Sequence, residues 1–194
     1  GGRVRVTSSL NVGALDLKHP QKMRLAGIER DYARRLMNAY VALGCIPSWT
    51  CAPYQAGYRP KCGENIAWAE SNAVVFANSV LGARTNRYGD FMDICAAITG
   101  RVPLTGLHIE ENRFATVVVD TSKISATLKN SDVFYAVLGS WLGRHIGDEI
   151  AVFSDLPKDV SEDQLKALGA SAASSGGVAL FHVEGVTPEA STLK

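Results

Sequence analysis

Apolar residues follow two different spacings along the chain. Short runs alternate apolar and polar positions, as strands with one buried face do, while longer stretches repeat apolar residues every three or four positions, as helices do. The spacing predicts strands at residues 3–7, 115–119, 150–153 and 177–183, extended chain at 45–51, and helices at 27–43, 66–81, 91–99, 131–144 and 161–173. Strands interleaved with helices predict an α/β fold, with layered helices and a mixed or parallel sheet.

Residue types at the ends of these stretches support the helix boundaries. Gly44, Gly82 and Gly100 follow predicted helices, where glycine favours the left-handed conformation that ends a helix. Residues 161–164, Ser-Glu-Asp-Gln, form a capping box at the start of another. Thr187-Pro188-Glu189 combines an N-cap, a helix-starting proline and an acidic first turn just before the sequence stops. We therefore expect the sequence to be cut within a larger protein.

The stretch 66–81 has few charges, so its helix should be buried, yet it contains the polar residues Glu70, Ser71, Asn72, Asn78 and Ser79. Burying such groups is costly unless they are hydrogen-bonded. They could form a polar network that fixes helix packing, or they could bind a ligand.

The segment that follows is Arg84-Thr85-Asn86-Arg87. Its two guanidinium groups flank a hydroxyl and an amide. Arginine offers paired donors that match a carboxylate, so this segment favours a carboxylate-binding site.

Composition excludes several classes of protein. The 194 residues include 20 Lys+Arg and 19 Asp+Glu, a formal net charge of +1, with 46% hydrophobic and 20% charged residues. These values are typical of a globular domain and exclude disorder, collagen and coiled coil. The basic residues are dispersed, so we expect no nucleic-acid partner. No apolar run is long enough for a membrane span or a secretory leader, and we expect a cytoplasmic protein without membrane contact.

The four cysteines, Cys45, Cys51, Cys62 and Cys95, contain no C-x-x-C pair. A zinc site is therefore poorly supported, and in a reducing compartment each cysteine could be a core thiol, a metal ligand or a nucleophile. The sequence also lacks G-x-G-x-x-G, P-loop, H-E-x-x-H and G-x-S-x-G motifs, which argues against dinucleotide-binding enzymes, P-loop kinases, zinc proteases and serine hydrolases.

Residues 60–87, PKCGENIAWAESNAVVFANSVLGARTNR, resemble the signature of aconitase X, a branch of the aconitase superfamily. Similar segments occur at residues 7–11, 50–54, 96–108 and 175–185, so the resemblance extends over essentially the whole chain. It implies that residues 1–194 are part of an aconitase-like catalytic core that continues beyond Lys194 in the parent protein.

The resemblance also implies an activity, that of a hydro-lyase which removes water from a small hydroxy acid. Its cofactor would be an iron–sulfur cluster (2Fe-2S or 4Fe-4S) or iron. Family members act on cis-3-hydroxy-L-proline, which yields 1-pyrroline-2-carboxylate, or on mevalonate 5-phosphate. Cys62 and residues 87–91 resemble the hydroxyproline type more closely. The expected partners are the remainder of the catalytic chain and a small swivelling domain or subunit.

Candidate roles follow from the family motifs and from the chemistry of dehydration. Cys51, in the Thr-Cys-x-Pro-Tyr motif, corresponds to one of three cluster ligands, and the other two would lie in segments beyond the equivalent of Lys194. The substrate-binding candidates are Asn11, Asn72, Arg84, Thr85, Asn86 and Arg87, and the catalytic candidates are Glu70, Ser71 and Lys61.

The sequence is also compatible with two other functions. A phosphomevalonate enzyme would need an additional cationic pocket for the phosphate. A cluster-free binding or assembly module would use Cys51 only as a core thiol.

Overall fold

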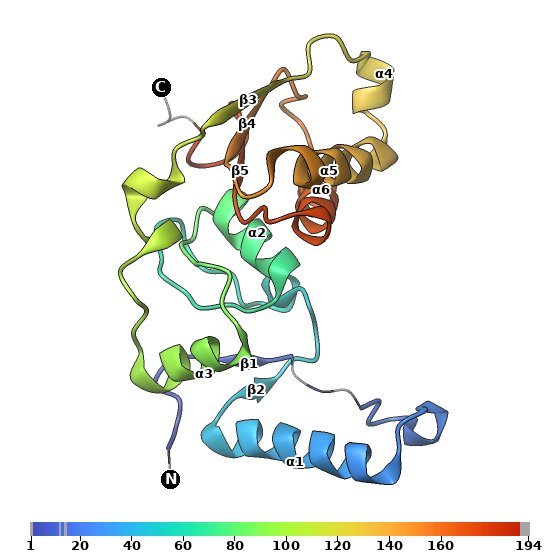
Figure 1. The fold of residues 1–194 in the computed structure, drawn as a ribbon, viewed down its shortest axis with the longest axis vertical. Helices are drawn as coiled ribbons and strands as arrows, with labels where there is room; N and C mark the ends of the chain where they lie inside the picture. Colours follow the sequence, from blue (N-terminus) through green and yellow to red (C-terminus); the bar gives the residue numbers. More distant parts are fainter. Residues whose placement is uncertain (1, 12, 14, 191–194) are drawn as a thin grey trace.

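A computed structural model describes residues 2–11, 13 and 15–190 (Figure 1). Its helices are α1 (Gly27–Leu43), α2 (Ser71–Ser79), α3 (Asp90–Thr99), α4 (Ala126–Lys129), α5 (Asp132–Ile146) and α6 (Glu162–Ser175). Its strands are β1 (Ser9–Leu10), β2 (Ile46–Pro47), β3 (Val117–Asp120), β4 (Ala151–Ser154) and β5 (Phe181–Val183). Short 3-10 turns are η1 (Pro20–Lys22), η2 (Pro53–Gln55), η3 (Gly106–His108) and η4 (Glu110–Arg113).

The second half of the chain is a layered α/β unit. Strands β3, β4 and β5 form a parallel sheet in that order, with Val119, Phe153 and Val183 in register. Helices α5 and α6 pack closely on each other because Gly139 and Gly143 have no side chain, and a Cβ on either would collide with the main chain of α6. The predicted fold class, α/β with parallel strands, is confirmed.

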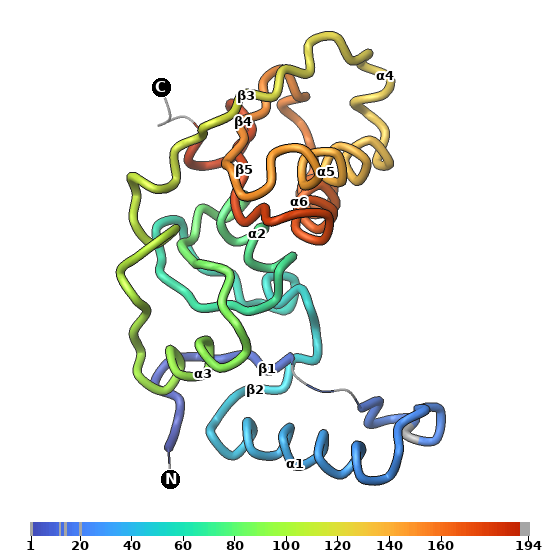
Figure 2. The backbone as a smooth tube through the Cα atoms, viewed as in Figure 1, coloured from blue at the N-terminus to red at the C-terminus, as the bar shows by residue number. Residues whose placement is uncertain are grey.

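The first half is built around α2, whose residues 73–79 are all buried. Helix α2 lies between the α5–α6 layer and the end of the molecule that carries α1 and α3 (Figure 1). Tyr54, from η2, stacks on Phe76 with ring centroids 3.8 Å apart. The first residues of the chain run beside α3 (Figure 2), where the Arg5 amide donates to the Ala97 carbonyl.

Several predicted boundaries are confirmed. Helix α1 ends at Leu43 and Gly44 adopts a φ of 100°, and α3 ends at Thr99 with Gly100 at a φ of 66°. The capping box of α6 forms as predicted, with the Gln164 amide donating to the Ser161 hydroxyl. These signals depend on neighbouring residues only, which is why the sequence reveals them.

The predictions for residues 3–7 and 66–81 need correction. Residues 3–7 form no strand, because Val4 and Arg5 donate to carbonyls of Leu43 and Ala97, at helix ends. Helix α2 starts only at Ser71 and ends at Ser79, and its C-cap is Val80 and not Gly82. The residues before it run beside 82–84, with the Arg84 amide donating to Glu64 and the Ile66 amide donating to Arg84.

Strands β3 and β5 are shorter than predicted, β4 has the predicted length but begins one residue later, and the last predicted helix is described only in part. Strand β5 covers only Phe181–Val183 of the predicted 177–183. Of the helix predicted from Thr187, residues 188–190 form a turn, and the rest lies outside the described residues.

Helix α1 exposes several apolar side chains. Ile28, Tyr32 and Leu36, spaced four residues apart, are 62%, 59% and 46% exposed. Nothing in the described residues shows what would cover this apolar surface. Within the same residues, no helix is both long and apolar enough to cross a membrane.

A buried polar network joins the two halves of the chain at Asn78. Its amide nitrogen donates to the carbonyls of Thr85 and Ala179, both at 2.9 Å. Its amide oxygen accepts from the Thr85 amide at 3.0 Å and from Arg113 at 3.1 Å. The Asn78 side chain therefore uses both of its donor and both of its acceptor positions within the protein. It fixes helix packing and has no hydrogen-bonding position left for a ligand.

Arg113 is the charged member of the network and is only 2% exposed. Its guanidinium pairs with Glu189, with Nη2 at 2.6 Å from Oε2, and it also donates to the carbonyls of Asn78, Ala83 and Leu107. A buried charge is tolerated only when it is paired and hydrogen-bonded in this way.

Replacing Arg113 with methionine should lower the free energy of unfolding by about 3 kcal/mol or more, because the change leaves several buried acceptors without a donor. Urea denaturation of the full-length protein would measure the change, with Arg101→Met, at an exposed position, as the control. Equal stability of the two variants would contradict this role for Arg113.

Candidate functional site

Cys51 and Asn11 meet beyond the carboxyl ends of the paired strands β1 and β2. Parallel pairing of these strands places the chain after Leu10 beside the chain after Pro47. Cys51 is exposed, and the Asn11 amide donates to its sulfur at 3.3 Å. The structure therefore brings together these two residues, predicted as metal ligand and substrate contact.

Glu70, Ser71 and Asn72 occupy the N-cap and the first turn of α2, and all three are half-buried. The Asn72 amide donates to the Glu70 carboxylate at 3.1 Å. Ala52, which follows Cys51 in the chain, packs against the apolar cluster that contains Ala73 of α2. This packing connects the start of α2 with the segment that carries the thiol.

In the 84–87 segment, the two middle side chains bond to the protein, and the two outer ones are arginines that differ in their partners. The buried Thr85 hydroxyl donates to the Asn86 carbonyl, and the Asn86 amide donates to the Thr105 carbonyl while its oxygen accepts from the Leu107 amide. Arg84 pairs at 3.1 Å with Glu110, a largely exposed carboxylate. Arg87 is exposed and has no hydrogen bond or ion pair within the described part of the chain.

Lys61, the third catalytic candidate, is exposed and lies in the irregular segment that precedes α2 in the sequence. Its main-chain amide donates to Glu64. The neighbouring Cys62 packs against Gly82, which has a φ of 68° and no room for a Cβ. No hydrogen bond or ion pair links Lys61 to the Cys51 or Arg87 groups within residues 2–11, 13 and 15–190.

A chain of hydrogen bonds through the buried His108, beside Arg87, was not among the predicted site residues. The Tyr88 hydroxyl lies 2.6 Å from Nε2 of His108, and Nδ1 of His108 lies 2.7 Å from the Asn65 side-chain oxygen. Burial of His108 lowers its pKa, and the charges of Arg113 and Arg84 lower it further. His108 lies in one of the segments that resemble aconitase X, but an isolated histidine gives no sequence signal of its partners.

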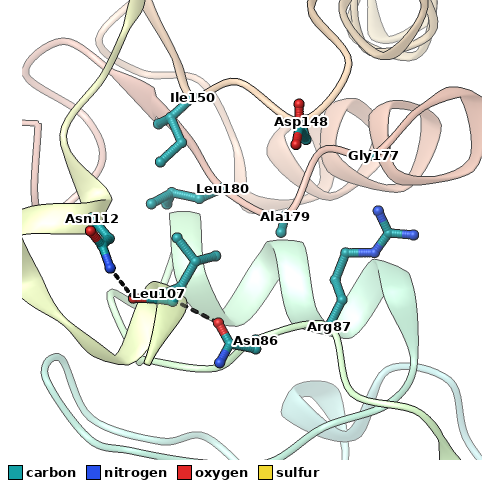
Figure 3. A pocket seen from close by; sticks show the side chains of 10 residues that line it. Asn86, Arg87, Leu107, Asn112, Asp148, Ile150, Gly177, Ala179 and Leu180 are labelled. Atoms are coloured by element: carbon teal, nitrogen blue, oxygen red, sulfur yellow. Dashed lines mark hydrogen bonds between the residues drawn. The ribbon is translucent and has the colours of Figure 1, made fainter. Parts of the chain in front are cut away.

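A pocket of about 310 Å³ lies between the two halves of the molecule (Figure 3). The first half contributes Asn86, Arg87, Gly106, Leu107 and Asn112, and the second contributes Asp148, Ile150, Gly177, Ala179 and Leu180. Two of the predicted substrate contacts, Asn86 and Arg87, therefore line this pocket, whereas Cys51 does not.

The described residues fit one ligand of an iron–sulfur cluster. Cys51 has an exposed thiol that accepts a hydrogen bond from Asn11, and such bonds to sulfur tune cluster thiolates. The other three cysteines are free and lie elsewhere, and no group of three or more His, Cys, Asp or Glu side chains in the described ranges is placed to hold a metal ion.

The fold closely matches a solved structure, that of Thermococcus kodakaraensis aconitase X in its holo-form. The TM-score is 0.83 at 39% sequence identity, and the match covers 100% of this chain and 47% of that one. Residues 1–111 match the family model of the aconitase X first domain, and residues 115–194 match that of the second domain. The chain therefore belongs to the aconitase X family, as its sequence motifs indicated.

Curated relatives carry two different enzyme names. The chain is 45% identical to a cis-3-hydroxy-L-proline dehydratase of Hypocrea jecorina and 44% identical to one of Pseudomonas aeruginosa, covering 100% of this chain and 33% of each relative. It is also 45% identical to the phosphomevalonate dehydratase large subunit of Methanothermobacter thermautotrophicus, covering 97% of this chain and 46% of that protein. The chain thus spans a third to about half of these relatives, all named as dehydratases, which are hydro-lyases.

We expect the stability of the fold to decline as the pH falls below 6.5, the ordinary pKa of histidine. Burial lowers the pKa of both His108 and His182, so in this range the unfolded chain binds protons that the folded chain does not. The stabilisation from the two neutral histidines is fully present above pH 6.5. It is lost as the pH falls through the lower pKa values that these histidines have in the folded protein.

Urea unfolding at several pH values would measure this decline, and NMR titration of the imidazole signals would assign it. His108→Gln should make the dependence of the unfolding free energy on pH shallower. The contribution of His182 to this dependence should remain in the variant. Constant stability from neutral pH down to the folded-state pKa values would contradict the expectation.

Proposed function

We propose that residues 1–194 form part of the catalytic region of an iron–sulfur-dependent dehydratase that converts cis-3-hydroxy-L-proline to 1-pyrroline-2-carboxylate. The observation that carries the dehydratase activity is similarity at 44–45% identity, over the whole chain, to two dehydratases named for cis-3-hydroxy-L-proline. The choice of substrate is supported by the charges that line the pocket between the two halves. The exposed Cys51 thiol and the free Arg87 guanidinium give the chain groups suited to such a reaction.

Mevalonate 5-phosphate is the second candidate substrate, because relatives named for phosphomevalonate reach the same identity. That substrate carries a phosphate as well as a carboxylate and would need an additional cationic pocket. The pocket between the two halves instead places one arginine, Arg87, together with one aspartate, Asp148. One positive and one negative side chain suit an amino acid such as hydroxyproline better than a substrate with two anionic groups.

The proposed reaction removes a proton next to a carboxylate, so negative charge builds up on a group that is already anionic. The site must therefore supply cations and hydrogen-bond donors. Arg87 is available to bind the carboxylate. Arg84 can join it at little cost, because its partner Glu110 is largely exposed and such ion pairs contribute little.

Cys51 would hold the iron–sulfur cluster, whose open iron would act as a Lewis acid on the leaving hydroxyl group. Glu70 is our candidate for the group that takes the proton, since Asn72 holds its carboxylate at the start of α2. Ser71, whose hydroxyl has no hydrogen bond within the described residues, would orient the substrate. Lys61 remains the alternative acid or base.

The proposal requires further protein to complete the site. The remaining cluster ligands and a small swivelling domain or subunit would come from outside the region that this chain shares with its relatives, which covers 33–48% of them. The four cysteines are free thiols, which suits a reducing compartment such as the cytoplasm.

Proton NMR of cis-3-hydroxy-L-proline with the anaerobically prepared full-length protein tests the activity. We expect loss of substrate signals and formation of the cyclic imino acid. Cys51→Ser should lower turnover by about 100-fold or more and lower the bound iron, because it removes a cluster ligand. Cys95→Ser, at an exposed thiol on α3, serves as the matched control and should change neither.

Other outcomes would replace this proposal with a specific alternative. Turnover of mevalonate 5-phosphate, without turnover of hydroxyproline, would reassign the substrate. Absence of turnover together with absence of iron, and no effect of Cys51→Ser, would support a cluster-free binding module.

A further inference from the structure

The pocket between the two halves contains two opposite charges without partners. Arg87 and Asp148 are both exposed, and neither forms a hydrogen bond or ion pair with any described residue. In Figure 3 the Arg87 side chain extends toward the two segments that carry Asp148, between α5 and β4, and Gly177, between α6 and β5. The pocket thus presents a cation from the first half and an anion from the second.

The lining between these charges is mostly apolar, with Leu107, Ile150, Ala179 and Leu180 contributing side chains. A ligand that fits must therefore combine an apolar body with a negative group and a positive group. The volume of about 310 Å³ lies at the small end of the range typical of ligand pockets.

The walls of the pocket are held in place before any ligand arrives. The Asn86 side chain makes three hydrogen bonds within the protein, and Gly106 beside it has a φ of 57° and no room for a Cβ. The Asn112 amide donates to the Gly106 carbonyl at 3.1 Å. On the other side, the Ala179 carbonyl is fixed by Asn78. A preformed pocket avoids the cost of ordering its walls on binding.

We propose that this pocket binds the zwitterion of a small cyclic amino acid, with Arg87 binding the carboxylate and Asp148 binding the ammonium group. The paired donors of arginine suit a carboxylate, and an aspartate accepts from a protonated amine. A ligand with two anionic groups would be repelled by Asp148. This inference rests on the proposed function for the choice of a proline-like ligand, and it adds Asp148 as the residue that selects for an amino group.

Binding can be measured without turnover, using L-proline, which has no hydroxyl group to eliminate. Isothermal titration calorimetry of the full-length protein should show binding of L-proline, and both R87Q and D148N should weaken it by about tenfold. Two analogues separate the charges. Cyclopentanecarboxylate, which lacks the amine, should lose affinity in R87Q but not in D148N, and pyrrolidine, which lacks the carboxylate, should show the reverse.

Matched controls are Arg101→Gln and Glu149→Gln, at exposed positions outside the pocket lining. Both should bind L-proline as the unmodified protein does. The inference is overturned if L-proline does not bind, or if R87Q and D148N bind it normally. Turnover of hydroxyproline with normal binding in both pocket variants would refute this inference alone, whereas charge-dependent binding of L-proline without turnover of hydroxyproline would refute the proposed function alone.

Discussion

Burial of the Arg113 guanidinium is the constraint on which the arrangement of the two halves depends. A charge that is almost fully removed from water must find an acceptor for each of its donors, and Arg113 finds them on α2, on the turn after α2, on η3 and on Glu189. These acceptors lie far apart in the sequence. Through Arg113, Glu189 of the second half is joined to α2 and η3 of the first half, and the pocket lies between these two halves.

The same network explains why neighbouring residues in the 84–87 segment differ in what they can do. Asn78 holds both main-chain groups of Thr85, so the segment is fixed at this point. Thr85 and Asn86 then direct their polar groups into the protein, and Arg87 is left to face the pocket. A motif that reads as four equivalent polar residues is therefore divided into residues that shape the site and a residue that can bind a ligand.

Local signals in the sequence predict the C-terminal ends of α1 and α3 and the start of α6, because left-handed glycines and caps depend only on adjacent residues. The start of α2 was predicted too early because residues 63–66 bond to residues 82–84, about twenty positions away, and apolar spacing does not reveal such pairing. The site follows the same division. The family motifs predict Cys51, Asn11 and Arg87 as site residues, whereas the buried Arg113 and His108 become recognisable only through partners that folding brings to them.

Sequence similarity does not choose between the two candidate substrates, and the chemistry explains why. Both dehydrations need a carboxylate clamp and a metal-activated leaving group, so the motif around residues 60–87 suits either of them. The substrates differ in the rest of the molecule, where one carries an amine and the other a phosphate. A residue that distinguishes them should therefore lie outside the shared motif. Asp148, which we propose as the amine-binding residue, meets this requirement, because it comes from the second half of the chain and lines the same pocket as Arg87.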